Sequence, residues 1–138
     1  AEEKKKLMAA DAAEQQQRAD QALLSTYADE KDLNTARDRA AGEIERSVKG
    51  AETNLVELHK TKSGLQAEAA ALKGKPVPYQ LKRKIERNQT TINDQQTVLE
   101  LKKKELEETQ AKFEGFRKRL RELKGGSGGG TAAPGSAQ

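Results

Sequence analysis

The stretch LKGKPVPYQLK, Leu72–Lys82, decides how this chain folds, because it holds two of the three prolines in the sequence. Proline has no backbone N–H and clashes with the preceding helical turn, so neither Pro76 nor Pro78 can continue a helix. Gly74 suits the left-handed backbone conformation that commonly ends a helix. Together these residues predict the tight tip of a helical hairpin over residues 74–78.

Apolar side chains recur on both sides of this tip with alternating spacings of four and three residues, over residues 44–72 and 81–123. This heptad pattern is typical of a coiled coil, in which a narrow stripe of each helix, here called the seam, faces its partner. The seam residues expected to make the contact between the helices are Ile44, Leu55, Leu58, Leu65, Ile85, Ile92, Leu99, Leu106, Phe113, Phe116 and Leu120.

The seam after the tip is polar at several positions, and two of them are the amides Asn88 and Gln95. A polar residue at a seam position can fix the register or the number of helices, at some cost in stability. We expect both residues to act in this way. Folding the chain at the predicted tip places Leu58 opposite Gln95.

The predicted fold class is all-α, a long antiparallel two-helix coiled-coil hairpin with an additional N-terminal helix and a disordered C-terminal tail. The hairpin covers residues 29–124, with arms at 30–73 and 79–124. Residues 1–28 are expected to form an Ala/Gln-rich helix followed by a break. The Gly/Ser/Ala composition of residues 125–138 predicts the tail.

Opposite charges are expected to meet where the first arm begins and the second arm ends. Residues 29–45 carry six acids and three bases, whereas residues 113–124 carry five bases and two acids. Each exposed ion pair contributes only ~0.2–1 kcal/mol, so this pattern indicates register more than stability. Asp29, with Asp32 three residues later, is expected to cap the first arm.

A two-helix hairpin with one narrow seam buries little apolar surface and is marginally stable by itself. We therefore hypothesise a third helical contributor to the seam. It is either the N-terminal helix folded back or a second copy of the chain.

Composition argues against an enzyme. Charged residues make up 35% of the chain and hydrophobic residues 33%, the second value well below the ~45–50% of ordinary globular domains. One histidine and no cysteine exclude His-dependent triads and thiolate metal sites. We therefore predict no catalytic residue, no metal and no cofactor. No apolar run approaches the ~18 residues of a transmembrane helix, and the well-mixed net charge of +4 does not favour nucleic acid as a partner.

Basic residues gather around the tip, where residues 72–87 carry six bases and one acid, Glu86. A run of charge is usually a solvated face. The functional interpretation is that this basic head touches an anionic surface of the cell envelope. The basic cluster consists of Lys73, Lys75, Lys82, Arg83, Lys84 and Arg87.

Three stretches together resemble a known family: LLSTYADEKDLNTARDRA (Leu23–Ala40), GKPVP (Gly74–Pro78) and FRKRLRELK (Phe116–Lys124). They resemble the C-terminal helical region of proteobacterial exported proteins of unknown function, which usually carry a signal peptide and a small N-terminal domain of unknown function. The resemblance covers roughly residues 16–124. It implies a periplasmic or cell-envelope location and no known enzymatic activity. The signal peptide is not in this chain, so a cytoplasmic location stays open.

The sequence thus predicts a non-enzymatic structural or protein-interaction module of the cell envelope, a coiled-coil hairpin that acts as a stalk, spacer or self-association element. Its expected partner is itself, as a dimer or higher oligomer, or another helical protein. The alternative is a periplasmic chaperone-like holdase or adaptor that binds clients through its helical arms or basic tip.

Overall fold

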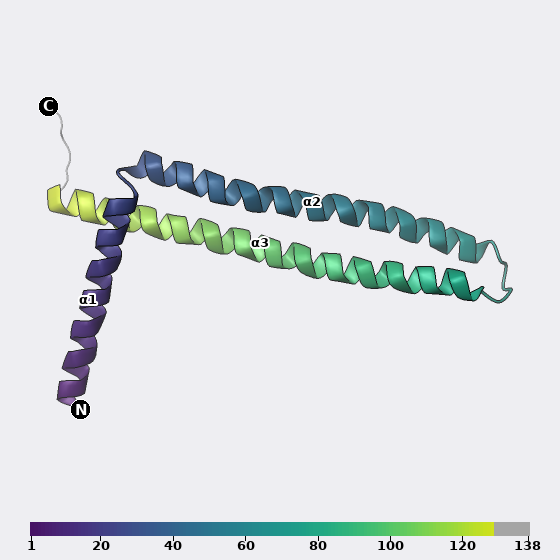
Figure 1. Ribbon diagram of the computed structural model, residues 1–138, viewed down its shortest axis with the longest axis horizontal. Helices are drawn as coiled ribbons and strands as arrows, with labels where there is room; N and C mark the ends of the chain where they lie inside the picture. Colours follow the sequence, from purple (N-terminus) through teal and green to yellow (C-terminus); the bar gives the residue numbers. More distant parts are fainter. Residues whose placement is uncertain (129–138) are drawn as a thin grey trace. The chain divides into compact units, whose positions relative to one another are not determined.

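The computed structural model describes residues 1–128, and helices make up all of their regular secondary structure (Figure 1). This confirms the predicted all-α class. Residues 129–138 of the predicted tail lie outside the described residues. The helices are α1 (Glu2–Thr26), α2 (Glu30–Ala70) and α3 (Tyr79–Gly128).

A reciprocal cap separates α1 from α2. Tyr27 leaves the helical conformation at φ −121° and ψ 115° and so ends α1. The Asp29 carboxylate accepts a hydrogen bond from the backbone N–H of Asp32 at 2.9 Å, and the Asp32 carboxylate accepts one from the N–H of Ala28 at 3.1 Å. These bonds satisfy N–H groups that an uncapped helix leaves without partners. The predicted capping role of Asp29 is therefore confirmed.

The tip, which joins α2 to α3, is longer than the sequence predicts and covers residues 71–78, because α2 ends at Ala70 and not at Lys73. The backbone N–H groups of residues 72, 73 and 75 each donate to the carbonyl three residues earlier, which winds the chain into tight turns. Lys73 and Gly74 then adopt positive φ values of 50° and 85°. Gly74 takes the left-handed conformation as expected, whereas nothing in the sequence predicts the same conformation at Lys73.

Helix α3 begins at Tyr79, directly after the second proline of the tip. The carbonyl of Pro78 accepts the first helical hydrogen bond, from the N–H of Lys82 at 3.0 Å. At its other end α3 continues to Gly128, so the prediction of a disordered tail from residue 125 is wrong for residues 125–128. An existing helix gains one hydrogen bond for each added residue, so it can extend by a turn into a glycine-rich segment.

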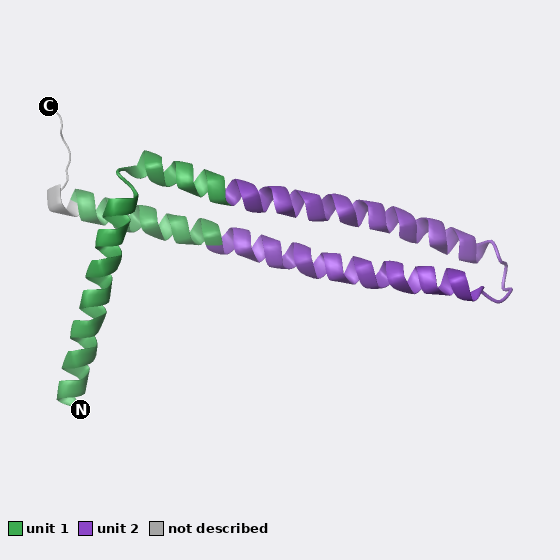
Figure 2. Cartoon of the chain, in the orientation of Figure 1, with its two compact units in different colours: residues 1–40, 109–138 green, residues 41–108 purple. Residues whose placement is uncertain are grey.

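The chain divides into two compact units, which Figure 2 shows in different colours. Unit 1 holds residues 1–40 together with the chain from Thr109 onward, and unit 2 holds residues 41–108. Within unit 2, parts of α2 and α3 run side by side in opposite directions and are joined by the tip. Within unit 1, the start of α2 lies beside the part of α3 that belongs to the same unit.

Unit 1 has a small but closed core. Leu33 is completely buried, and Leu23, Phe113 and Leu120 are buried with it. The Phe113 and Phe116 rings meet edge to face with their centroids 5.8 Å apart, a favourable arrangement for aromatic pairs. Leu23 is the one residue of α1 in this core.

The N-terminal part of α1 takes no part in packing, because residues 1–19 are all exposed. Alanine and charged side chains dominate these residues. They offer too little large apolar surface to hold a helix against a neighbour.

In unit 2, side-chain exposure follows the predicted heptad spacing. Leu55 and Ile92 are buried, but most seam residues of this unit keep part of their surface in water. The residues between the seam positions are almost all exposed, including Leu101 with 62% of its surface in water. The apolar contact between α2 and α3 in this unit is therefore narrow and incompletely covered. The half-buried seam residues are Ile44, Leu58, Leu65, Ile85, Leu99 and Leu106.

Candidate functional site

The polar seam residue Asn88 makes a contact between α2 and α3 in unit 2. It is buried, and its side-chain amide donates a hydrogen bond to the backbone carbonyl of Leu58 at 3.2 Å. The predicted register placed Leu58 opposite Gln95, whereas the Leu58 carbonyl accepts its hydrogen bond from Asn88, which lies nearer the tip. The tip is three residues longer than predicted, because α2 ends at Ala70, and this moves the facing residues of α3 toward the tip.

Gln95 behaves differently from Asn88. It is half-buried, and among the described residues its side chain makes no hydrogen bond. An amide at the edge of the seam can be satisfied by water, so it selects a register less strongly than a buried amide does. Of the two predicted register residues, only Asn88 makes a directional contact with the neighbouring helix.

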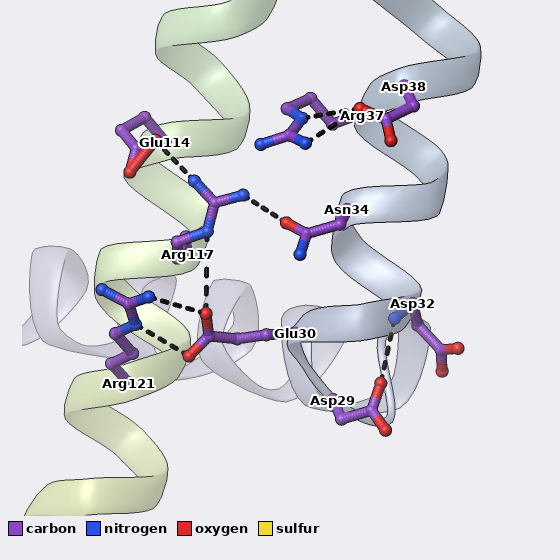
Figure 3. A network of polar contacts seen from close by, with 9 residues as sticks. All are labelled: Asp29, Glu30, Asp32, Asn34, Arg37, Asp38, Glu114, Arg117 and Arg121. Atoms are coloured by element: carbon purple, nitrogen blue, oxygen red, sulfur yellow. Dashed lines mark hydrogen bonds and ion pairs between the residues drawn. The ribbon is translucent and has the colours of Figure 1, made fainter.

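A polar network in unit 1 centres on Arg117 (Figure 3). The Arg117 side chain is only 11% exposed and donates to Glu114 of the same helix at 2.6 Å. It also donates to the side-chain carbonyl of Asn34 on α2 and lies 3.7 Å from the Glu30 carboxylate. A guanidinium offers five donors in a planar fork, which lets one buried arginine serve three acceptors.

Arg121 completes the network with a two-point contact. Its guanidinium donates to both oxygens of the Glu30 carboxylate, at 2.7 and 2.8 Å. These bonds hold the pKa of Glu30 below its ordinary value, and the charge of Arg121 acts in the same direction. The predicted meeting of acids at the start of α2 with bases near the end of α3 is thereby confirmed.

A second ion pair fixes the end of α1 in unit 1. Arg119 donates to both carboxylate oxygens of Asp20, at 2.9 and 2.8 Å, and the Asp20 side chain is only 15% exposed. Hydrogen bonding from Arg119 lowers the pKa of Asp20 to about 2. Beside this pair, the Tyr27 ring lies 6.2 Å from that of Phe116, measured between centroids. The end of α1 is thus held by this ion pair, by the buried Leu23 and by the contact of Tyr27, which directly follows the helix, with Phe116.

The basic cluster at the tip has none of this internal pairing. All six of its residues are exposed. Arg83 lies 3.6 Å from Glu86, and the other five bases have no ion pair or side-chain hydrogen bond within residues 1–125. The structure therefore presents the predicted anion-contacting residues together, with their charge turned toward solvent.

The remaining predicted site residues lie where the seam requires them. Phe113 and Leu120 are buried and Phe116 is half-buried in unit 1, whereas Leu55 and Ile92 are the buried large apolar residues of unit 2. In the part of the chain that the structure describes, no three acidic, histidine or cysteine side chains gather to hold a metal ion. None of its helices is long and apolar enough to cross a membrane.

Sequence reasoning missed Arg117 and the pair formed by Asp20 and Arg119. Arg117 follows the seam residue Phe116 directly, and a heptad pattern assigns such a position to the solvated flank. The surplus of bases in residues 113–124 indicated that this segment would meet acids, but it did not indicate which base would be buried.

Comparisons with protein-family models, with curated proteins and with solved structures found no match for this chain.

Proposed function

We propose that this protein is a non-enzymatic, antiparallel coiled-coil hairpin that associates with a second copy of itself and so serves as a structural spacer. As a straight helix, α2 with its 41 residues would span about 60 Å. We further propose that the protein works in the cell envelope, on the sequence resemblance alone.

One observation carries this proposal: large apolar residues of the seam in unit 2 remain half-exposed along both helices. Leu58 and Leu65 lie seven residues apart on α2, and Leu99 is a seam residue of α3. All three keep part of their surface in water. Two helices leave such a stripe open at its flank, whereas three or four helices can close it. Residues 1–19 offer only two large apolar side chains, Leu7 and Met8, so a second copy of the chain is the preferred cover.

Solution mass measured by light scattering after gel filtration, across a concentration series, tests this proposal. We expect a dimer or higher oligomer that dissociates on dilution and withstands raised salt, because burial of apolar surface is insensitive to screening. A monomeric mass at every concentration would overturn the proposal.

A matched pair of variants locates the contact. Leu99 and Leu101 are the same residue type on the same helix, but Leu99 is a half-buried seam residue and Leu101 is exposed. Leu99→Glu should lower the solution mass, and Leu101→Glu should not. Circular dichroism must show that both variants keep their helix content. If Leu99→Glu loses helix content, the milder Leu99→Ala takes its place.

The alternative function, a holdase or adaptor, finds support in a different feature. Leu7 and Met8 are exposed large apolar residues on the unpacked part of α1, and such residues can bind unfolded chains loosely. The test is whether the chain suppresses the aggregation of an unfolded protein. Suppression that is lost in the double variant Leu7→Ser/Met8→Ser would favour this function over the spacer.

A further inference from the structure

The charge at the tip is concentrated and uncompensated. Six bases and one acid fall within residues 72–87, and the one ion pair there, between Arg83 and Glu86, is long at 3.6 Å. Elsewhere on the same helix acids are more frequent among the bases and pair with them, as Glu114 does with Arg117 at 2.6 Å and Glu105 with Lys102 at 3.6 Å. The tip therefore keeps a positive potential that its own residues do not cancel.

The position of these bases works against helix stability. The N-terminus of a helix carries partial positive charge, which favours acids in the first turn and disfavours bases. The first turn of α3 has no acid, and Lys82, Arg83 and Lys84 follow directly. Pro78 accepts the first helical hydrogen bond but has no side-chain oxygen to cap the free N–H groups. Folding alone does not favour this arrangement.

Apolar side chains stand exposed in the middle of this charge. Val77 lies between the two prolines of the tip with 40% of its surface in water, and Tyr79 opens α3 with 71% exposed. A site that only bound a soluble polyanion would gain little from an exposed valine. A bilayer surface uses both kinds of group, because apolar and tyrosine side chains enter the interface while surrounding bases contact anionic headgroups.

We propose that the tip and the first turns of α3, residues 72–87, bind the surface of a bilayer that contains anionic lipids. Val77 and Tyr79 enter the headgroup region, and the basic cluster contacts lipid phosphates around them. Single-stranded nucleic acid is the weaker fit, since Tyr79 is the one aromatic residue in this segment and such sites stack several bases. This proposal does not depend on self-association, because no half-buried residue of α2 is needed for it.

Co-sedimentation of the full chain with vesicles tests the proposal. We expect binding to vesicles of equal parts phosphatidylcholine and phosphatidylglycerol, and none to pure phosphatidylcholine. Binding should weaken steeply between about 0.15 M and 1 M salt, where the Debye length falls from about 8 to 3 Å. No binding to the anionic vesicles at the lower salt would overturn the proposal.

Two charge-reversal variants make a matched comparison. Lys82→Glu/Lys84→Glu changes the cluster, whereas Lys103→Glu/Lys104→Glu makes the same charge change at exposed positions in the middle of α3. Each Lys→Glu change alters the charge by two units, so the first variant alters it by four. At about fivefold in affinity for each unit of charge near the membrane surface, this variant should lose at least about 100-fold. The second should lose much less. Equal losses would mean that net charge, and not the tip, drives binding.

A third variant separates a lipid surface from other anions. Val77→Ser/Tyr79→Ser keeps every charge, yet it should weaken vesicle binding by about tenfold because apolar burial is lost. It should leave the binding of a single-stranded oligonucleotide unchanged. If the oligonucleotide binds the unmodified chain as tightly as the vesicles do, and this variant changes neither affinity, the tip is a general polyanion site and the lipid proposal fails.

Discussion

Basic side chains have opposite roles in unit 1 and in the basic cluster at the tip. In unit 1, the network residues Arg117 and Arg121 pair with an acid of α2, and Arg119 pairs with an acid of α1. In the cluster, five of six bases have no partner among residues 1–125. Charge that is satisfied internally fixes how helices meet, whereas unpaired charge is available to a partner.

The largest effect on the free energy of unfolding should come from replacing apolar side chains between the helices of each unit. Leu33→Ala in unit 1 removes a completely buried side chain and should lower the free energy of unfolding by about 2–4 kcal/mol. Leu65→Ala, at a half-buried seam position in unit 2, should lower it by about 1 kcal/mol. Urea unfolding followed by circular dichroism measures both. Equal losses at a concentration where the chain is monomeric would contradict this difference in coverage.

The next largest effect concerns the arginines themselves. Arg117→Ala leaves the side-chain carbonyl of Asn34 without its donor and removes the ion pair with Glu30, so it should lower the free energy of unfolding by about 1–3 kcal/mol. Lys84→Ala, in the cluster, should change it by less than about 0.5 kcal/mol. Arg117→Lys keeps the charge but not the planar fork and should fall between them. A loss at Lys84 as large as that at Arg117 would remove the distinction between paired and unpaired charge.

Acid should loosen unit 1 through its ion pairs. The pKa of Asp20 in the folded protein is about 2, below its ordinary value of 3.8. The carboxylate therefore stabilises the fold above about pH 4, and this contribution disappears as the pH falls from about 4 to 2. The protection of the amides in the last turns of α1, which is the intrinsic exchange rate at each pH divided by the observed rate, should fall over this range. Asp20→Asn should abolish that pH dependence, and an unchanged profile in the variant would disprove the role of this pair.

The smallest effect is an increase in stability, caused by replacing a base near the start of α3. Lys82→Glu places an acid near the start of α3 and should raise the free energy of unfolding by about 0.3–1 kcal/mol at low salt. Lys103→Glu, in the middle of the same helix, should have almost no effect of this kind. Thermal unfolding at low and high salt measures both, and the gain should vanish when salt screens it. A destabilising Lys82→Glu would show that the cluster supports the fold after all.

The sequence predicted which residues form the seam and where the chain turns, but not the register between α2 and α3. The seam follows from apolar spacing, so residues such as Ile92 and Phe113 lie buried where expected. The register does not follow from spacing, because it depends on how many residues the tip consumes. That number was set by tight turns and a left-handed Lys73, a conformation for which lysine has no preference.

The contacts of α1 were also out of reach from the sequence. The pairing of Asp20 with Arg119 joins residues far apart in the chain, and no repeat relates them. Their charges are common on exposed helices, where most such residues remain solvated. Only the position of the break after Tyr27 brings the two groups together, and the sequence indicated the break without its geometry.

The two tyrosines provide intrinsic fluorescence, with one tyrosine in each of the two charged regions. The sequence contains no tryptophan, so its near-ultraviolet emission comes from Tyr27 and Tyr79 alone. Tyr27 lies against Phe116 in unit 1, and Tyr79 stands in water at the start of α3. In Tyr79→Phe, the remaining emission reports the attachment of α1. In Tyr27→Phe, it reports whatever touches the tip, and collisional quenching by acrylamide should fall when that surface becomes covered.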